Sequence, residues 1–315
     1  MIDPWLKLTL LMSVAGIIGY IAQRTGLCMI RGVTELRAGK PTLLLAMLSC
    51  GVLVWLFVPL AKLVNIDIPH VRYDLHIIFA LGGLIFGLGT SANGGCSVST
   101  ISRLARGDFH MLATVLGWVV GWSWWLSLPL FKEAVSTLSA VSVPIIVAEF
   151  VVWLAAAYWA IKHSPASRRL WISIMAVGLL AGLMFLLQPN WSPSDLVQSF
   201  ASAALHDDVP AWPERNRYLV LLALLTGMVI AAWITRRFAL QRVYLQRMLL
   251  HFAAGVAMGL GACMAMGGND TQLLLALPAA SPGAILAIAG MLTGIYIGVV
   301  LRQPLARFRQ YLGIR

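Results

Sequence analysis

Residues 89–100 read GTSANGGCSVST, a stretch with three glycines and five hydroxyl side chains between two strongly apolar segments. A glycine pair favours the end of a helix, and lipid offers no partner to the backbone groups that a helix break sets free. The hydroxyls of Ser97, Ser99 and Thr100 suit the start of a new helix. We therefore predict a broken helix whose second half begins after Cys96 and lines a path for a small anion, because helix starts attract negative charge.

The composition places this break in a membrane protein. The chain has 315 residues, of which 60% are hydrophobic and only 11% are charged, whereas a soluble domain carries about 25% charge. Nine segments are long and apolar enough to cross about 30 Å of hydrocarbon: 5–23, 41–62, 76–93, 109–131, 143–162, 169–187, 218–236, 247–266 and 282–301. Four more, 25–38, 96–105, 190–205 and 269–278, are too short or too polar to cross. We predict an all-α polytopic protein with re-entrant half-helices, and one transport domain over residues 1–315.

The basic residues predict the orientation of the chain. With the N-terminus outside, 17 of the 23 lysines and arginines fall on the inner side, as the positive-inside rule requires. The C-terminus is then cytoplasmic. The net charge of +11 is explained by this distribution at the span ends, so we expect no nucleic-acid partner.

The first break has a counterpart later in the chain. The segment GGLIFGLGTSANGGCSVST from Gly82 resembles AGVAMGLGACMAMGGNDTQ from Ala254, about 172 residues on, with a one-residue slip. A G-x-x-x-G helix follows each copy, at Gly117/Gly121 and Gly290/Gly294, and we interpret these glycines as helix-packing residues. A weaker pair joins 16–32 to 178–194. Corresponding segments are separated by an odd number of spans, which predicts an inverted repeat typical of transporters, with halves at about 5–131 and 169–301 and a linker span at about 143–162.

The four cysteines occur without a CxxC pair or metal-ligand spacing, so we expect neither a disulfide framework nor a metal site. Cys50 lies within a span and suits a small buried apolar residue. Cys28 and Cys96 lie at breaks, and Cys263 precedes Gly268 by five residues. A thiol is a soft, weak donor and suits a substrate sulfur atom better than a hard oxyanion.

The candidate path residues are therefore those at or next to the breaks. They are Cys28, Cys96, Cys263, Gly26, Asn93, Gly94, Gly95, Ser97, Gly267, Gly268, Asn269 and Asp270, with Arg24, Arg31, Gln188 and Asn190 as secondary candidates. Arg24 and Arg31 would attract an anion at the inner mouth, although topology explains them equally well. Glu149 suits a structural pairing as well as a functional role, and Asp195 suits the first turn of a helix.

Three stretches in order, GLCMIRG, GTSANGGCSVST and GGNDTQLLLALPAASPGA, resemble the YeeE/YedE-type sulfur transporter family over about residues 8–301. The resemblance implies uptake of thiosulfate or related inorganic sulfur across the bacterial inner membrane, an hourglass-like fold, and central cysteines, here Cys28 and Cys96, that relay the substrate by S–H hydrogen bonds. It also implies a cytoplasmic TusA-like or rhodanese sulfurtransferase as acceptor, and no cofactor. The family commonly has a Gly-Cys pair before Asn269, where this chain has Gly267-Gly268. Either Cys263 replaces the missing thiol or the path has one thiol fewer.

Other functions stay open at this point. The alternative, also a transport function, is a different small species: sulfite, sulfide, polysulfide or a selenium compound. A membrane sulfurtransferase with a persulfide on Cys96 or Cys28 would need an activating base or cation. No histidine stands beside either cysteine, so we expect no enzyme activity. A purely structural subunit has no need of an inverted repeat with buried polar breaks.

Overall fold

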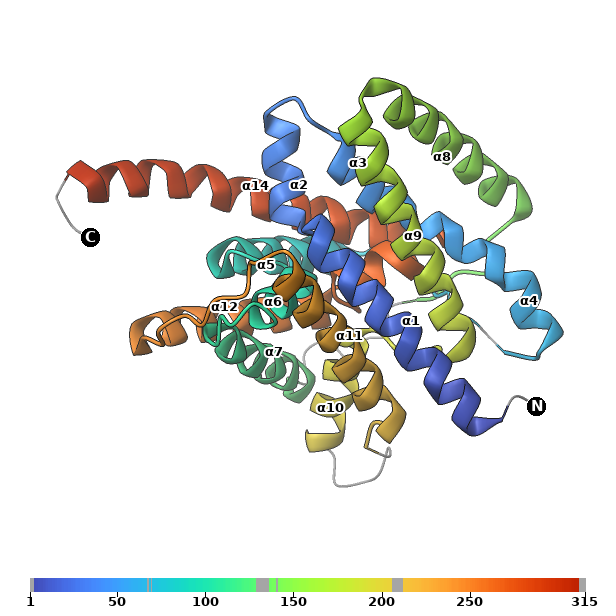
Figure 1. Ribbon diagram of the computed structural model, residues 1–315, viewed down its shortest axis with the longest axis horizontal. Helices are drawn as coiled ribbons and strands as arrows, with labels where there is room; N and C mark the ends of the chain where they lie inside the picture. Colours follow the sequence, from blue (N-terminus) through green and yellow to red (C-terminus); the bar gives the residue numbers. More distant parts are fainter. Residues whose placement is uncertain are drawn as a thin grey trace.

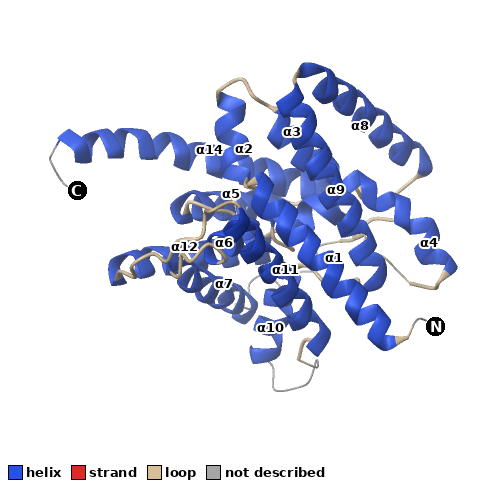
Figure 2. Ribbon diagram, in the orientation of Figure 1, coloured by secondary structure: helices blue, strands red, loops and turns tan. Residues whose placement is uncertain are grey.

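The computed structural model describes residues 3–66, 68, 70–128, 136–139, 141–205 and 212–311. Within these ranges every regular element is a helix and no strand is found (Figure 2). The two ends of the chain lie on opposite sides of the molecule (Figure 1). This confirms the predicted all-α class.

The helices before residue 130 include two short pieces that directly follow long ones. They are α1 (Pro4–Thr25), α2 (Met29–Arg37), α3 (Thr42–Ser49), the 3₁₀ helix η1 (Cys50–Phe57), α4 (Val58–Leu63), α5 (Ile77–Asn93), α6 (Ser97–Leu104) and α7 (His110–Ser127). The segment 41–62, predicted as one span, is thus three helical pieces that change winding at Cys50 and Val58. Pro59 lies in the first turn of α4, where its missing N–H group removes no helical hydrogen bond.

The later helices repeat this alternation of long and short pieces. They are α8 (Val143–His163), α9 (Pro165–Leu187), α10 (Pro193–Leu205), α11 (Arg215–Ile234), α12 (Leu245–Met264), α13 (Asn269–Thr271), the π-helical turn η3 (Gln272–Ala276) and α14 (Pro282–Tyr311). The short pieces α2, α6, α10 and α13 with η3 lie in the four segments predicted to be too short to cross. The predicted linker, α8, lies at the edge of the molecule beside α9 (Figure 1).

Among the described residues, eight helical segments are long and apolar enough to cross a membrane. They are Pro4–Arg37, Thr42–Leu63, Ile77–Leu104, Val143–His163, Pro165–Leu187, Arg215–Ile234, Leu245–Met264 and Pro282–Arg302. The ninth predicted span, 109–131, is not among them: its residues 129–131 lie outside the described ranges, and it forms α7 (His110–Ser127). Its 18 residues include four tryptophans and a histidine, whose polar N–H groups lower its hydropathy.

The long helices pack in two glycine-lined pairs, α7 along α12 and α5 along α14. A Cβ on Gly117 or Gly121 would overlap a backbone oxygen of α12, and a Cβ on Gly290 or Gly294 would overlap one of α5. The packing role predicted for these G-x-x-x-G motifs is confirmed. Each pair joins a helix from before residue 130 to one from after residue 240.

Two further pairs also join distant parts of the chain. Helix α1 packs along α11, and α9 packs on η1. Such an exchange of partners is expected of two repeat halves, and the inverted repeat stays a prediction. The boundaries of the halves stay a prediction.

Candidate substrate path

The first break lies at the GTSANGGCSVST stretch. Helix α5 ends at Asn93, and Gly94 adopts a left-handed conformation with φ 73°. The Gly94 and Gly95 N–H groups donate to the carbonyls of Ser91 (3.1 Å) and Thr90 (3.2 Å), which ends α5. Cys96 is then the residue directly before α6, so the predicted broken helix is present.

The second break, between α12 and α13, repeats the same backbone path 172 residues later. Met266 has φ 57°, which matches Gly94. Gly268, with φ −73° and ψ 177°, matches Cys96, with φ −76° and ψ −176°. The predicted one-residue slip between the copies is therefore wrong, because backbone conformation aligns them without a gap. The position equivalent to Cys96 is a glycine, so the second break has no thiol at its tip.

The two breaks meet in the interior. The Ser97 hydroxyl donates a hydrogen bond to the side-chain oxygen of Asn269. Both residues are buried, and each follows the helix break of its own copy. The structure thus brings together two predicted path residues that are 172 positions apart.

A third break joins the cysteines. Helix α1 ends at Thr25, Gly26 has φ 69°, and Cys28 is the residue before α2. The side chains of Cys28 and Cys96 are neighbours, and the Ser99 hydroxyl beside them in this cluster lies 3.5 Å from the Cys96 thiol. Cys96 is fully buried and Cys28 is partly buried. Two thiols and a hydroxyl therefore form one cluster where α2 and α6 begin.

The fourth break, between α9 and α10, carries different chemistry. The Ser192 hydroxyl accepts a hydrogen bond from the Asp195 N–H group (3.2 Å), which caps α10. The Ser194 N–H group donates to an Asp270 carboxylate oxygen (3.1 Å), and the Ser194 and Thr271 hydroxyls are 2.9 Å apart. This cluster therefore offers hydroxyl and carboxylate oxygens in place of thiols.

Arginines satisfy the carbonyls that the breaks leave free. Arg31 donates to the Thr25 carbonyl (2.6 Å), Arg103 to that of Asn93 (2.8 Å) and Arg302 to that of Ala92 (2.6 Å). In the second copy Gln272 donates to the Ala265 carbonyl (2.5 Å). The sequence indicated only topology for Arg103 and Arg302, and topology or anion attraction for Arg31. The signal that we missed is a donor side chain shortly after three of the breaks, at Arg31, Arg103 and Gln272.

Asn93 is the centre of a buried hydrogen-bond network at the first break. Its amide nitrogen donates to the Gly95 carbonyl (2.9 Å) and to the Thr100 hydroxyl (2.7 Å). Its oxygen accepts from the Thr114 hydroxyl (2.7 Å) and lies 2.8 Å from Nδ1 of His251. The sequence predicted Asn93 as a path residue, but its contacts assign it to positioning the break. The sequence analysis assigned no role to His251.

The other candidates lie apart from the thiol pair. Cys263 is buried in α12, and in the described part of the chain no hydrogen bond connects its thiol to Cys28 or Cys96. Gln188 lies 3.5 Å from Glu214, and Asn190 is exposed. Arg24 donates to the Tyr20 hydroxyl (3.1 Å).

The four breaks lie in a part of the chain that matches a known family. A family model described as sulphur transport matches residues 24–297. The chain belongs to the sulphur transport family, of YeeE/YedE type. A comparison with curated proteins gave no match. The matched range runs from the end of α1 into α14, so all four breaks of this sulphur transport protein lie inside it.

Family and fold together define the general role. This member of the sulphur transport family is a multi-pass membrane protein that transports a sulfur anion. Within it, α2 and α6 present their first turns and their thiols at one place. The first N–H groups of a helix have no partner in the helix and carry partial positive charge. The arrangement combines an anion-attracting backbone with soft side chains.

Proposed function

We propose that the chain takes up thiosulfate into the cytoplasm through a path at the Cys28–Cys96 pair. The observation that carries this proposal is that two thiols lie next to each other, each directly before a helix, at the starts of α2 and α6. The partial positive charge of the helix starts attracts the anion. The two S–H groups donate weak hydrogen bonds to its terminal sulfur.

The rest of the path follows from the breaks. The anion passes Ser97 and Asn269, which meet at the interior, and Gly26, Gly94, Gly95, Gly267 and Gly268 let it approach the backbone closely. Asn93 positions the first break, and Asp270 belongs to the cluster of hydroxyl and carboxylate groups where α10 and α13 begin. Cys263 stays a candidate for the thiol that Gly268 lacks.

The proposed orientation has the N-terminus outside a bacterial inner membrane and the C-terminus in the cytoplasm. The distribution of basic residues supports this orientation. A TusA-like or rhodanese sulfurtransferase would then accept the sulfur on the inner side. The cysteines bind the substrate without forming a covalent bond, so the protein is not an enzyme.

The test is uptake of radiolabelled thiosulfate into proteoliposomes by the wild type and by cysteine variants. We expect Cys96→Ala and Cys28→Ala each to lower the initial rate by about tenfold or more, because a hydrogen bond to an ion contributes roughly 1.5–3 kcal/mol. Cys50→Ala is the matched control. That thiol is buried and lies 3.3 Å from the Met47 carbonyl in a different part of the fold, and its removal should leave the rate unchanged.

Three outcomes count against the proposal. Unchanged uptake by Cys96→Ala protein that is inserted and folded would remove its basis. Stronger competition by sulfite, sulfide, polysulfide or selenite than by unlabelled thiosulfate would assign a different substrate. A persulfide trapped on Cys96 during turnover would show covalent sulfur transfer.

A further inference from the structure

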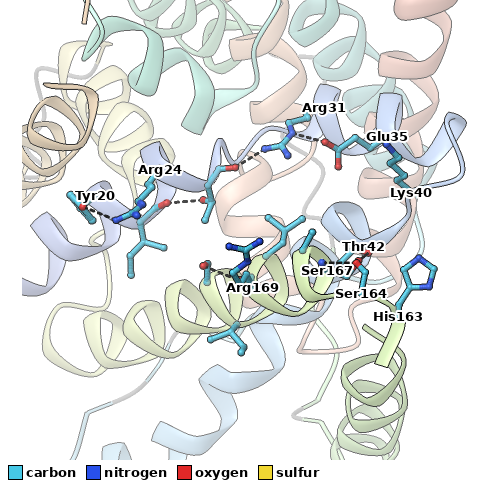
Figure 3. Close-up of a pocket in the computed structure, with 16 residues that line it drawn as sticks. Tyr20, Arg24, Arg31, Glu35, Lys40, Thr42, His163, Ser164, Ser167 and Arg169 are labelled. Atoms are coloured by element: carbon cyan, nitrogen blue, oxygen red, sulfur yellow. Dashed lines mark hydrogen bonds and ion pairs between the residues drawn. The ribbon is translucent and has the colours of Figure 1, made fainter. Parts of the chain in front are cut away.

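A basic cleft of about 950 Å³ lies between the end of α1, the region from α2 to the start of α3, and the first turns of α9 (Figure 3). Its lining includes the basic residues Arg24, Arg31, Lys40, His163 and Arg169, and Glu35 as its acidic residue. Neither Cys28 nor Cys96 lines it. The cleft is therefore a separate feature from the thiol pair.

Most of the positive charge in the cleft is uncompensated. Arg31 pairs with Glu35 at 2.7 Å and also donates to the Thr25 carbonyl. Arg24 donates only to the neutral Tyr20 hydroxyl, and in the described part of the chain no ion pair involves Arg24, Lys40 or Arg169. Arg169 extends from α9 into the cleft (Figure 3). This excess of basic groups favours an anionic ligand.

An apolar groove of about 530 Å³ continues from the cleft along α1. It lies between α1 and α11 and is lined by Met12, Ser13, Gly16, Ile17, Tyr20, Leu222, Ala223, Thr226, Gly227 and Ile230. Tyr20 lines both the groove and the cleft. Its α1 residues recur at four-residue steps, so they lie on one face of the helix. Ile17, Leu222 and Ile230 are exposed, and in a membrane they face lipid.

We propose that the cleft and groove together bind an anionic phospholipid. Its phosphate lies among Arg24, Arg169 and Lys40, and one acyl chain lies in the groove beside Ile17. Basic pockets between membrane helices bind anionic headgroups, and the start of α9 adds the backbone N–H group of Ala166, while the Ser167 N–H group donates to the Ser164 hydroxyl (3.1 Å). A small substrate anion needs the charges but not an adjoining apolar groove, so the lipid explains both features.

The depth of the cleft suits a headgroup at the membrane surface. On α9 its lining runs from Ser164 to Ser173, which corresponds to about 15 Å along a helix. The predicted orientation puts this end of α1 and α9 on the cytoplasmic side. The bound lipid would contact α1, α9 and α11, and so would hold together helices from both predicted halves.

The test is native mass spectrometry of the full-length protein in detergent with phosphatidylglycerol or phosphatidylcholine. We expect selective binding of phosphatidylglycerol by the wild type and about thirtyfold weaker binding by the double variant Arg24→Gln/Arg169→Gln, because each basic group near an anionic lipid contributes about fivefold. The matched control is Arg168→Gln/Arg242→Gln. Those arginines are exposed and do not line the cleft, so binding should match the wild type.

Two further measurements make the result decisive. Melting temperatures without added lipid show whether each variant is folded, and phosphatidylglycerol should raise that of the wild type and the control but not of the cleft variant. Long-chain phosphatidylglycerol should bind more tightly than its dihexanoyl form, because only the long chain fills the groove. Equal binding of both headgroups, equal loss in cleft and control variants, or displacement of the lipid by millimolar thiosulfate would overturn the proposal.

Discussion

Asn93 shows how one side chain positions a helix break. It is 1% exposed and connects the end of α5 to α6, α7 and α12 through Thr100, Thr114 and His251. A buried polar group is stable only when it is hydrogen-bonded, and this amide satisfies partners on three neighbouring elements. The orientation of α6, and with it the position of Cys96, therefore depends on Asn93.

We predict that Asn93→Ala destabilises the protein by about 3–5 kcal/mol, because it leaves several buried partners unpaired at roughly 1–3 kcal/mol each. Thermal denaturation in detergent measures the effect, and thiosulfate uptake should fall with it. The control is Asn190→Ala, since Asn190 is exposed in the segment between α9 and α10. Equal melting temperatures for the two variants would contradict the role of Asn93.

At the scale of elements, glycines set the distance between paired helices. Along α1 a Cβ on Gly19 would overlap the Leu224 carbonyl of α11, whereas a Cβ on Gly16 would lie 3.6 Å from the Ala223 carbonyl, an ordinary contact. Close backbone approach replaces hydrophobic burial as the source of helix association in lipid. Replacing Gly19 by alanine should therefore cost more stability than replacing Gly16, although both glycines belong to the same helix.

We predict that Gly19→Ala destabilises the protein by about 1–3 kcal/mol through overpacking, while Gly16→Ala is neutral or stabilises it by up to about 1 kcal/mol through higher helix propensity. Melting temperature and the yield of monodisperse protein measure both effects. A greater loss for Gly16→Ala than for Gly19→Ala would show that α1 and α11 do not pack as described.

The connection between α6 and α7 contains an ionic cluster that predicts pH dependence. Asp108 pairs with Arg103 (2.7 Å) and contacts His110 (2.9 Å). Burial raises the pKa of the Asp108 carboxyl. The His110 hydrogen bond and the Arg103 charge together lower this pKa by more than burial raises it, so the net shift is downward. A lowered folded-state pKa gives stability at neutral pH that is lost as pH falls through that pKa.

We predict that Asp108→Asn destabilises the protein by roughly 3 kcal/mol at neutral pH, because Arg103 loses its buried partner. The variant should lose less additional stability than the wild type on acidification. Melting curves at neutral and acid pH give both values. An identical acid-induced loss in the two proteins would exclude Asp108 as the source.

Across the whole molecule, the breaks carry two kinds of chemistry. The thiols of Cys28 and Cys96 gather where α2 and α6 begin, while Ser192, Ser194 and Asp270 gather where α10 and α13 begin. In the predicted inverted repeat these clusters are equivalent positions of the two halves. The two halves of the predicted repeat would therefore present soft donors at one pair of breaks and oxygen groups at the other.

We predict the orientation of the whole chain from its basic residues. The variant Asn65→Cys carries a new thiol after α4. A membrane-impermeant maleimide should label this variant protein in intact cells, because the predicted orientation puts residue 65 on the outer side. The variant Arg242→Cys carries its thiol between α11 and α12, and the maleimide should label this protein only after the membrane is permeabilised. Both positions are exposed, and wild-type protein gives the background from the native cysteines. The reverse pattern would invert the proposed topology.

The sequence alone determined the helical class, the four short segments and the breaks at Gly26, Gly94 and Gly267, because glycine conformation and hydropathy are local properties of the chain. It also indicated Cys28 and Cys96. Only the tertiary structure decided that Ser97 meets Asn269, that Asn93 binds His251, and that Arg302 caps α5. These contacts join residues far apart in the chain, and helix packing selects them by shape and hydrogen-bond satisfaction, which no local pattern records.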